Sequence, residues 1–382
     1  MNAGDGQDEV PNVRPCFEID EEGLRTLAEV LASGRVTNNG CHLQRFERLL
    51  AEYLGVKETV AVSNGSDALL LALTALGLPR GKAILPAYTY VATLNAVVHA
   101  GLEPVFCDIL TGSYTMDCAH LGELIARTSD VRCVLPVNVF GVPPDLRAIR
   151  SLCDGVGAAM VYDNAHGFGT EVDGRRVPGE PEVQIFSFHA TKTLPAVEGG
   201  LIVSEDPALL SLVRRLRNHG LTQVASGFVP GFNAKMDEIR AVIGSCSLRA
   251  FPDALARRRS YGHRLCSTLG RFEGVYELQA VPANVNANFQ NLGVRCPRAA
   301  SAGLEYVLGL FTARGIGVRS YFDPPLYKLK GYDGGPALPA TESVWRTLVS
   351  LPIHSRMTEA QLCRMEDAAC EVAKHLQSFP CR

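Results

Sequence analysis

Short apolar segments alternate with amphipathic helical segments between about residue 58 and residue 203 of this 382-residue chain. The predicted strands are Thr59–Val62, Ala83–Leu85, Pro104–Cys107, Cys133–Val137, Ala159–Tyr162, Gln184–Phe186 and Leu201–Val203. Helical patterns fall between them, as over Ser66–Leu76 and Asp145–Cys153. This order favours an α/β fold with a mostly parallel sheet that helices cover on both faces. Ligands of such sheets bind outside the carboxyl ends of the strands, so residues that follow strands are the first site candidates.

The rest of the chain predicts a second, smaller unit. Met236–Leu269 is one long amphipathic pattern broken by Pro252, and it predicts helices that lead out of the first unit. Strand-like segments at Val294 and Gly317–Tyr321 then precede a predicted helix over Thr358–Leu376. We expect three parts: a disordered tail over residues 1–10, a large domain over residues 11–247 and a small C-terminal α/β domain over residues 248–382.

Composition argues against several classes of protein. The formal net charge of −3 gives no reason to expect nucleic acid or an anionic membrane as a partner. Apolar runs such as Leu69–Leu76 are too short to span a bilayer, and Met1–Val10 lacks the pattern of a signal peptide. The 12 cysteines include no Cys-x-x-Cys pair, and Cys107 and Cys133 fall in apolar strands. We therefore expect no metal site, no disulfide framework and a cytoplasmic location.

Lys192 follows one predicted strand and precedes another, in a chain with only seven lysines among 37 basic residues. A lysine amine can lose its proton and form a covalent bond, which arginine cannot do. Asp163 ends an earlier strand, and His166 follows three residues later. This is the layout of pyridoxal phosphate (PLP) enzymes, in which a lysine holds the cofactor and an acid keeps its ring nitrogen protonated. Taken singly, each residue has a plainer interpretation, as a solvated loop lysine or a helix N-cap.

Three further segments suggest contacts to such a cofactor. Gly65 lets the backbone approach a ligand closely, and Ser66 opens a helix whose free N–H groups suit a phosphate, although a plain N-cap is the alternative. Tyr90 follows another strand and is either a ring that stacks on the cofactor or a core aromatic. Asn233 lies just before a helix, as an N-cap or a polar ligand contact.

Nine segments together are far more specific than any one of them. They are Ser63–Leu69, Pro86–Asn95, Pro104–Asp108, Pro136–Asp145, Asp163–His166, Ser187–Lys192, Arg217–Gly220, Gly231–Asp237 and Leu351–Pro352. In order and spacing, the chain resembles the DegT/StrS-type nucleotide-sugar aminotransferases over about residues 25–375. The resemblance implies the type I PLP-dependent aminotransferase fold, with a mostly parallel seven-stranded sheet in the large domain and a smaller C-terminal α/β domain.

The resemblance also implies roles for individual residues. Lys192 matches the Schiff-base lysine, and Asp163 matches the partner of the pyridinium nitrogen. Ser66 and Ser187 match the side chains that bind the cofactor phosphate, next to Gly65 in the first case. Tyr90 matches the aromatic residue that stacks on the ring.

Two matches bear on assembly and on the branch of the family. Asn233 matches an asparagine that reaches the phosphate of the neighbouring subunit, which implies a homodimer with shared active sites. His166 departs from the usual glutamine, which contacts the phenolic oxygen of the cofactor, but histidine can donate the same hydrogen bond. A dehydratase branch has histidine in place of the lysine, so Lys192 favours transamination.

The sequence around His166 and Lys192 most resembles the branch that aminates C4 of dTDP-4-keto-6-deoxyglucose in deoxyaminosugar biosynthesis. We therefore expect L-glutamate as the amino donor and a nucleotide sugar as the acceptor, with Glu198 and Tyr321 as candidate sugar contacts. Amination at C3 of a keto-sugar, or of a cyclitol, remains an alternative on the same scaffold. A non-catalytic PLP-binding regulator is a third possibility, but it is expected to lose the lysine.

Overall fold

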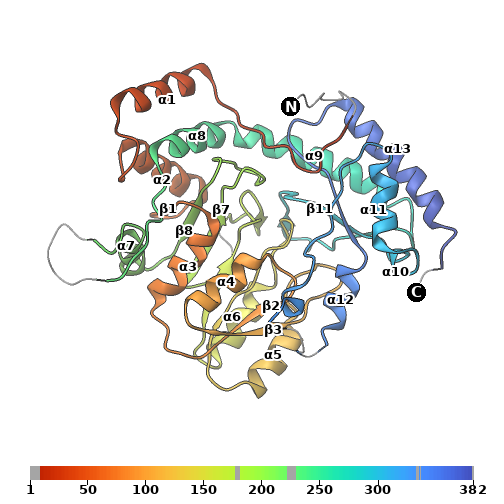
Figure 1. Ribbon diagram of the computed structural model, residues 1–382, viewed down its shortest axis with the longest axis horizontal. Coiled ribbons are helices and arrows are strands. Elements are labelled where there is room, and N and C mark those ends of the chain that lie inside the picture. Colours follow the sequence, from red (N-terminus) through yellow and green to blue (C-terminus); the bar gives the residue numbers. More distant parts are fainter. Residues whose placement is uncertain (1–8, 177–180, 222–228, 333–334, 336, 381–382) are drawn as a thin grey trace.

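A seven-stranded sheet forms the centre of the larger part of the molecule (Figure 1). The structure, a computed structural model, describes residues 9–176, 181–221, 229–332, 335 and 337–380. The strands are β1 (Val60–Val62), β2 (Lys82–Pro86), β3 (Glu103–Cys107), β4 (Val131–Val134), β5 (Ala159–Asp163), β7 (Val183–Ser187) and β8 (Gly200–Val203). Their order is β1-β8-β7-β5-β4-β2-β3, and β8 alone runs against its neighbours. The predicted mostly parallel sheet of seven strands is thus confirmed.

Strand β4 is the one whose bounds differ most from the prediction of Cys133–Val137. The strand begins earlier, at Val131, and ends at Val134. Pro136 has no N–H to donate to a ladder, so regular pairing stops before it. An isolated bridge between Val137 and Asp163 resumes the contact with β5.

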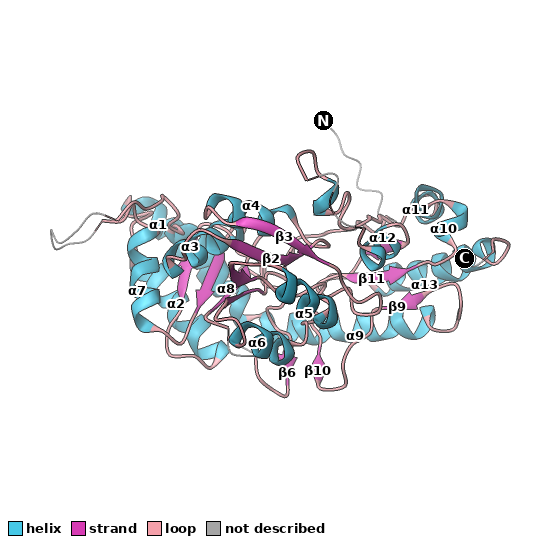
Figure 2. Cartoon of the chain, turned by 90° about the horizontal axis from the view of Figure 1, so that it is seen from below, coloured by secondary structure: helices cyan, strands magenta, loops and turns pink. Residues whose placement is uncertain are grey.

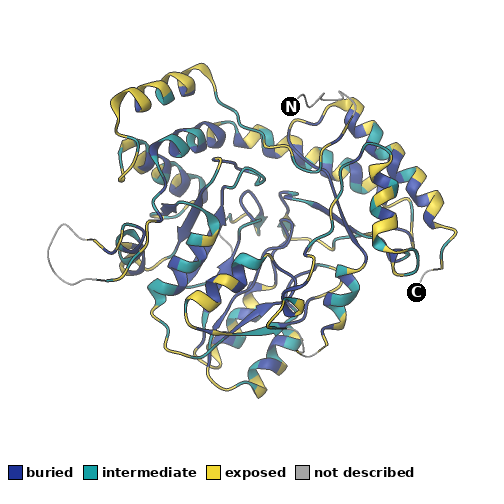
Figure 3. Cartoon of the chain, in the orientation of Figure 1, coloured by how far each residue is buried: buried dark blue, intermediate teal, exposed yellow. Residues whose placement is uncertain are grey.

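Helices cover both faces of the sheet, because side chains alternate along each strand. Ala83 and Leu85 pack into one buried cluster and Ile84 into another. The helices of the first cluster are α3 (Gly65–Leu76), α4 (Val91–His99) and α7 (Pro207–Leu216). The opposite face is covered by α2 (Cys41–Leu54), α5 (Cys118–Arg127), α6 (Leu146–Asp154) and α8 (Glu238–Arg249), and α1 (Glu21–Ser33) packs on α8. Figure 3 shows the strands buried between these layers.

A second core lies at the other end of the molecule (Figure 2). It combines the antiparallel strands β9 (Glu277–Leu278), β11 (Leu292–Arg295) and β12 (Leu348–Leu351) with the helices α10 (Ala299–Ala302), α11 (Leu304–Thr312) and α13 (Glu359–Leu376). The remaining elements are the pair β6 (Glu171–Val172) and β10 (Val285–Asn286), the short helix η1 (Leu326–Lys328) and α12 (Pro339–Trp345). The terminal helix predicted over Thr358–Leu376 is present, with Thr358 as its N-cap.

The long helix α9 (Phe251–Leu269) joins the two cores. Its first half contributes Phe251 and Leu255 to the core of the large sheet, whereas Leu265 and Leu269 belong to the smaller core. Pro252 lies in the first turn of α9, where a missing N–H costs no helical hydrogen bond, and so it separates α8 from α9. The predicted division at residue 247 falls inside α8; we propose α9 as the element that the two domains share.

Two predictions, one for the smaller unit and one for the N-terminal tail, were wrong. Gly317–Tyr321 is not a strand, since its only pairing is an isolated bridge between Arg319 and Ser350. Val10 does not belong to a disordered tail: it is fully buried, and its backbone is hydrogen-bonded to Gly315 and Gly317. Glu9, also in the expected tail, is exposed, and residues 1–8 lie outside the described residues.

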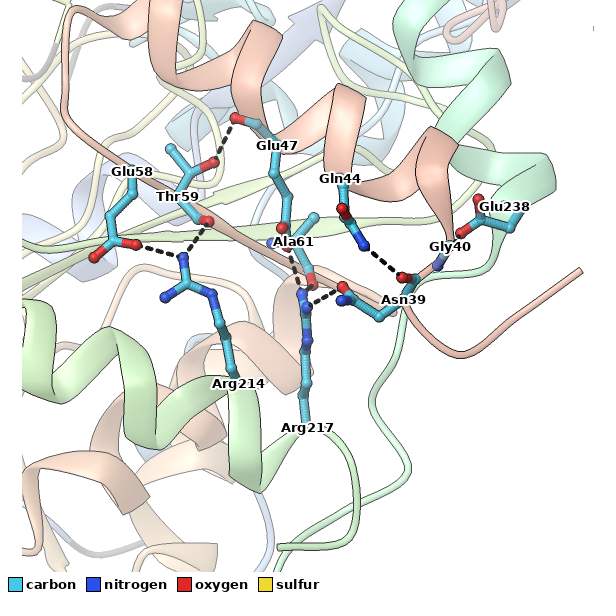
Figure 4. Close-up of polar contacts among 10 residues, drawn as sticks. All are labelled: Asn39, Gly40, Gln44, Glu47, Glu58, Thr59, Ala61, Arg214, Arg217 and Glu238. Carbon is cyan, nitrogen blue, oxygen red and sulfur yellow. Dashed lines mark hydrogen bonds and ion pairs between the residues drawn. The ribbon is translucent and has the colours of Figure 1, made fainter. Parts of the chain in front are cut away.

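Polar contacts fasten α2 to the edge strand β1 and to the end of α7 (Figure 4). Arg217 and Glu47 form an ion pair with 2.5 Å between Nη1 and Oε1, and both side chains are almost fully buried. Arg217 also donates to the carbonyl of Ala61 and to the side chain of Asn39. Glu238 accepts hydrogen bonds from the backbone at the start of α2. The Arg217–Gly220 motif is therefore tied into the framework of the large domain.

No helix within the described ranges is both long enough and apolar enough to cross a bilayer. Cys107 and Cys133 are buried, as the sequence predicts, and every cysteine in those ranges is a free thiol. The same ranges contain no cluster of three or more histidine, cysteine, aspartate or glutamate side chains that could hold a metal ion.

Candidate active site

A cavity of about 680 Å³ opens at the carboxyl edge of the sheet, between the two cores. It gathers residues that follow β1, β2, β5 and β7, as expected for a ligand site of this sheet type. Nine of the ten residues that the sequence singles out line it: Gly65, Ser66, Tyr90, Asp163, His166, Ser187, Lys192, Glu198 and Tyr321. Asn233 does not line the cavity of its own chain.

Asp163 is the last residue of β5 and is almost completely buried. Its Oδ2 accepts a hydrogen bond of 2.8 Å from the hydroxyl of Thr93, and its Oδ1 accepts one of 3.2 Å from the backbone of Ala165. Burial raises the pKa of Asp163, and these hydrogen bonds together with the charge of Lys192 oppose that shift. A cationic group bound against this carboxylate would compensate the cost of burial.

Lys192 lies in the turn after β7, where its backbone N–H donates to the carbonyl of His189. Burial lowers the pKa of its amine to about 8, although Asp163 and Glu198 act in the opposite direction. At neutral pH the amine is therefore much closer to its free, nucleophilic form than an ordinary lysine.

The turn that carries Lys192 is fixed from a distant part of the chain. The side-chain amide of Gln290, which is 5% exposed, accepts a hydrogen bond from Thr193 N and donates one to the carbonyl of Thr191, each at 2.9 Å. Asn288 donates in the same way to the carbonyls of His166 and Phe168. The residues at 288 and 290 thus hold the two loops that bring His166 and Lys192 to the cavity.

We expect the covalent capture of PLP by Lys192 to follow the lowered pKa. Below pH 8 the amine is protonated and cannot attack an aldehyde, so the capture rate should rise by about tenfold per pH unit up to pH 8 and level off above it. Stopped-flow absorbance of the cofactor-free protein mixed with PLP measures this profile. A rate that keeps rising to pH 10 would show that Lys192 titrates like a solvated lysine.

The start of α3 forms one end of the cavity. Asn64, rather than Ser66, is the N-cap, and its side chain accepts a hydrogen bond of 2.8 Å from Asp67 N. The backbone N–H groups of Gly65 and Ser66 donate to no described residue. A Cβ atom on Gly65 would meet the side chain of Ser187 at 2.9 Å, so the two segments meet closely. Free N–H groups, two hydroxyls and the helix dipole together suit a phosphate.

Two ring side chains lie farther along the cavity. Tyr90 is the N-cap residue of α4 and is 62% exposed, so a planar ligand could cover its ring. His166 lies nearly parallel to the rings of Phe140 and Phe322. Phe140 N donates to His166 Nδ1 at 3.2 Å, so the neutral imidazole carries its proton on Nε2 and can donate a hydrogen bond through it. Burial lowers the pKa of His166 well below its usual range, which keeps it neutral.

The two candidate sugar contacts also reach the cavity. Glu198 Oε1 lies 3.4 Å from His189 Nε2, and the Glu198 side chain is about half exposed. Tyr321 packs its ring against Phe140 and Phe322 and accepts a hydrogen bond from Tyr88 through its backbone carbonyl. Both side chains are therefore available to a ligand, and their roles stay predictions.

Asn233 lies on the surface beside the start of α3 rather than in the cavity. Its segment is anchored by a bridge to Asn218 and by a hydrogen bond from Ser63 N to Ala234 O. The Asn233 side chain accepts a hydrogen bond of 2.7 Å from Lys235 Nζ. Its predicted role toward a neighbouring subunit is not tested within a single chain.

Sequence reasoning missed several residues that the fold brings to the site. Thr93 lies one helical turn after Tyr90, so that spacing was the available signal for a second contact from α4. Gln290, Arg258 and His354 come from the smaller unit, and no local pattern marks them.

Fold and site together define a PLP-dependent aminotransferase. The residues present fit the cofactor: an anion-binding helix start, an exposed aromatic ring, a buried carboxylate and a lysine with a lowered pKa share one cavity. The chain belongs to the DegT/DnrJ/EryC1/StrS aminotransferase family, which matches it over residues 17–368.

Individual relatives cover almost the whole chain. It is 32% identical over 365 residues to the dTDP-3-amino-3,4,6-trideoxy-alpha-D-glucose transaminase of Streptomyces venezuelae, and the matched region covers 94% of each of the two chains. It is 28% identical over 360 residues to the dTDP-4-amino-4,6-dideoxy-D-glucose transaminase of Escherichia coli, covering 92% of this chain and 95% of that one. The solved structure of S. venezuelae DesV in complex with a ketimine intermediate matches with a TM-score of 0.86 and 30% identity. The match covers 95% of this chain and 99% of the DesV chain. The prediction that the chain is a PLP-dependent sugar aminotransferase is thus confirmed.

Proposed function

We propose that this enzyme transfers the amino group of L-glutamate to C4 of dTDP-4-keto-6-deoxyglucose. The observation that carries the proposal is the cavity that Lys192 and Asp163 both line, and its volume of about 680 Å³ lies within the roughly 300–1,000 Å³ of small-molecule and cofactor sites. The choice of C4 is supported by the sequence around His166 and by similarity to the E. coli transaminase, whose name specifies a 4-amino sugar.

The chain contributes groups that hold the reactants and move protons. PLP, when bound, supplies a carbonyl carbon that accepts the amino group and a ring that delocalises negative charge. Lys192 Nζ holds the cofactor and, once the amino donor has displaced it, takes up and returns the proton that moves during transfer. The Asp163 carboxylate, oriented by Thr93, stabilises a protonated ring nitrogen. His166 Nε2 donates a hydrogen bond into the cavity.

Transfer then runs in two halves with one net exchange. Glutamate gives up its amino group and leaves as 2-oxoglutarate, and the keto-sugar nucleotide receives the amino group in place of its carbonyl oxygen. The same lysine and the same acid serve both halves, so both substrates must reach this one cavity in turn.

Amination at C3 is the second candidate, because the S. venezuelae relative is named for a 3-amino sugar. Both reactions need the same lysine, acid and phosphate site, so the contacts to the sugar must decide between them. Glu198 and Tyr321 are the contacts that we propose for that choice. A non-catalytic regulator is disfavoured, since Lys192 is retained.

The test is a panel assay. The PLP-loaded enzyme is incubated with L-glutamate and a series of 3-keto and 4-keto sugar nucleotides and a keto-cyclitol, and the aminated carbon is identified by NMR. Formation of a 4-amino-4,6-dideoxy sugar with an equal amount of 2-oxoglutarate supports the proposal. A 3-amino product or an aminated cyclitol replaces it with an alternative.

We further propose that the enzyme is a homodimer in which Asn233 of one subunit contacts the cofactor phosphate of the other. Its support is the position of Asn233, which is exposed beside the phosphate end and yet absent from the cavity of its own chain. Two such sites related by a twofold axis would be completed reciprocally.

We expect complementation between two impaired variants. Lys192→Ala lacks the covalent lysine, and Asn233→Ala lacks the contact that the partner needs, so a mixed dimer contains one site with both residues intact. Mixing the two variants under conditions of subunit exchange should restore activity toward about a quarter of the wild-type value, the share expected from random pairing of subunits. Lys192→Ala carried through the same subunit-exchange procedure without the second variant is the control. Full activity of a monomer, or of Asn233→Ala alone, would contradict the shared site.

A further inference from the structure

One wall of the cavity, away from the start of α3, carries positive charge without acidic side chains among its described residues. It is built from residues 12–16 and from lining residues beyond 250, and we call it the arginine wall after Arg14, Arg258 and Arg319. Among the described lining residues of this wall none is acidic, whereas Asp67, Asp163 and Glu198, together with the basic residue Lys192, come from the strands of the large sheet or the segments that connect them. The field within the cavity therefore draws an anion toward the arginine wall.

His354 is the most informative residue of this wall. It is 2% exposed, lines the cavity, and neither ring nitrogen has a hydrogen-bond partner within the described part of the chain. Burial and the charges of Arg258 and Arg14 lower its pKa to about 4, so the ring is neutral at pH 7 and has one N–H to donate. Buried polar groups are nearly always paired, so an orphaned imidazole at a cavity wall points to a ligand.

Arg258 carries a charge that the protein leaves uncompensated. It projects from α9, is 8% exposed, and donates from Nε to Phe289 O at 2.6 Å and from Nη2 to Gln290 O at 2.7 Å. Both acceptors are neutral carbonyls. Within the described ranges Arg258 Nη1 has no hydrogen bond, and no carboxylate lies within ion-pair distance of the guanidinium. Burying a cation in this way is costly unless a ligand supplies the counter-charge.

We propose that Arg258 and His354 form a carboxylate-binding subsite for the amino-acid donor. Arg258 supplies the positive charge and His354 supplies a neutral N–H donor, while the exposed residues Arg14 and Arg319 attract anions to the cavity. The inference rests on the proposed function, because it assigns the donor subsite of the same cavity.

Burial distinguishes a carboxylate from the other anion of the reaction, the diphosphate of the nucleotide. Arg258 and His354 are both almost fully buried, and the charge of Arg258 acts on His354, so we expect a small carboxylate to reach both. A diphosphate is joined to a sugar on one side and a nucleoside on the other, so it needs an open groove. The exposed side chains Arg14 and Arg319 suit that larger group better.

The experiment compares the binding of two probes to the PLP-loaded enzyme by calorimetry. Glutarate, a dicarboxylate without an amine, reports on the donor subsite, and a nucleoside diphosphate, tested as dTDP and as GDP, reports on the nucleotide site. His354→Phe keeps an aromatic ring in place and removes the N–H. It should raise the dissociation constant of glutarate about 10- to 100-fold and leave the binding of the nucleoside diphosphate unchanged. Arg258→Lys keeps the positive charge but loses the planar guanidinium, which can pair with a carboxylate through two hydrogen bonds, so it should weaken the binding of glutarate as well. His375→Phe, on an exposed histidine of α13 outside the cavity, is the matched control.

Three other results would overturn the inference. If His354→Phe weakens the binding of the diphosphate and leaves that of glutarate unchanged, or weakens the binding of both equally, the wall is not a donor subsite. If neither probe is affected, His354 and Arg258 do not form an anion site. A failure of the proposed function is distinct, because it would appear as absence of amino transfer by the unmodified enzyme in the panel assay, whatever glutarate does.

Discussion

Lys192→Ala should abolish turnover while leaving the cofactor site able to bind pyridoxamine phosphate. The variant loses both the covalent attachment and the group that moves the proton, so we expect the transamination rate to fall by about 10³-fold or more. Binding should persist, because the start of α3, Ser187 and Asp163 remain in place. Single-turnover kinetics and equilibrium binding of pyridoxamine phosphate measure the two quantities separately.

A matched control is Lys374→Ala, on an exposed lysine of α13 that does not line the cavity. It should retain wild-type rates. If Lys192→Ala also retains near-normal rates, the covalent role assigned to this residue is wrong, and another amine must serve the reaction.

Asp163→Asn should separate chemistry from binding. Asparagine has nearly the same shape: its Oδ1 can accept from Ala165 N, and its NH2 can donate to the Thr93 hydroxyl, which can rotate to accept, so the loop after β5 should keep its structure. A neutral amide no longer favours a protonated ring nitrogen, since an opposite charge at contact is what raises that pKa, by about 1–3 units in typical cases. The negative charge that develops during proton abstraction then loses its stabilisation, and we expect the rate with L-glutamate to fall by about 10²- to 10³-fold.

The affinity for PLP should change far less than this rate. The phosphate contacts and Lys192 are untouched in the variant, so the loss of one ionic contact should raise the dissociation constant by no more than about 10- to 100-fold. Thr93→Val provides the comparison, because it removes the hydroxyl that orients Asp163 and leaves the charge. Collapse of binding, with an unchanged rate for the enzyme that remains loaded, would make Asp163 a structural residue.

The large sheet could be predicted from the sequence because each strand alternates between two buried faces and is followed by an amphipathic helix. Ala83, Ile84 and Leu85 show this pattern, and the structure assigns them to opposite clusters. The edge location of the site followed from the same reasoning, since Asp163 and Ser187 both end strands.

The rest depended on contacts between distant parts of the chain. Val10 ends a polar stretch of the sequence, yet it is buried, because it packs into the smaller core and its backbone is hydrogen-bonded to Gly315 and Gly317. Gly317–Tyr321 has the composition of a strand but pairs only at Arg319. The amide of Gln290 meets the turn of Lys192 across almost a hundred residues of sequence, and no local pattern could reveal such a contact.

Reduction of the PLP-loaded enzyme with borohydride, followed by digestion and mass spectrometry, identifies the lysine that holds the cofactor. If Lys192 is that lysine, pyridoxyl phosphate is found on Lys192 alone among the seven lysines, and the label is lost when L-glutamate is added before the reductant, because the donor releases the lysine. A label on another lysine, or a label on Lys192 that glutamate does not remove, would show that Lys192 does not have this role.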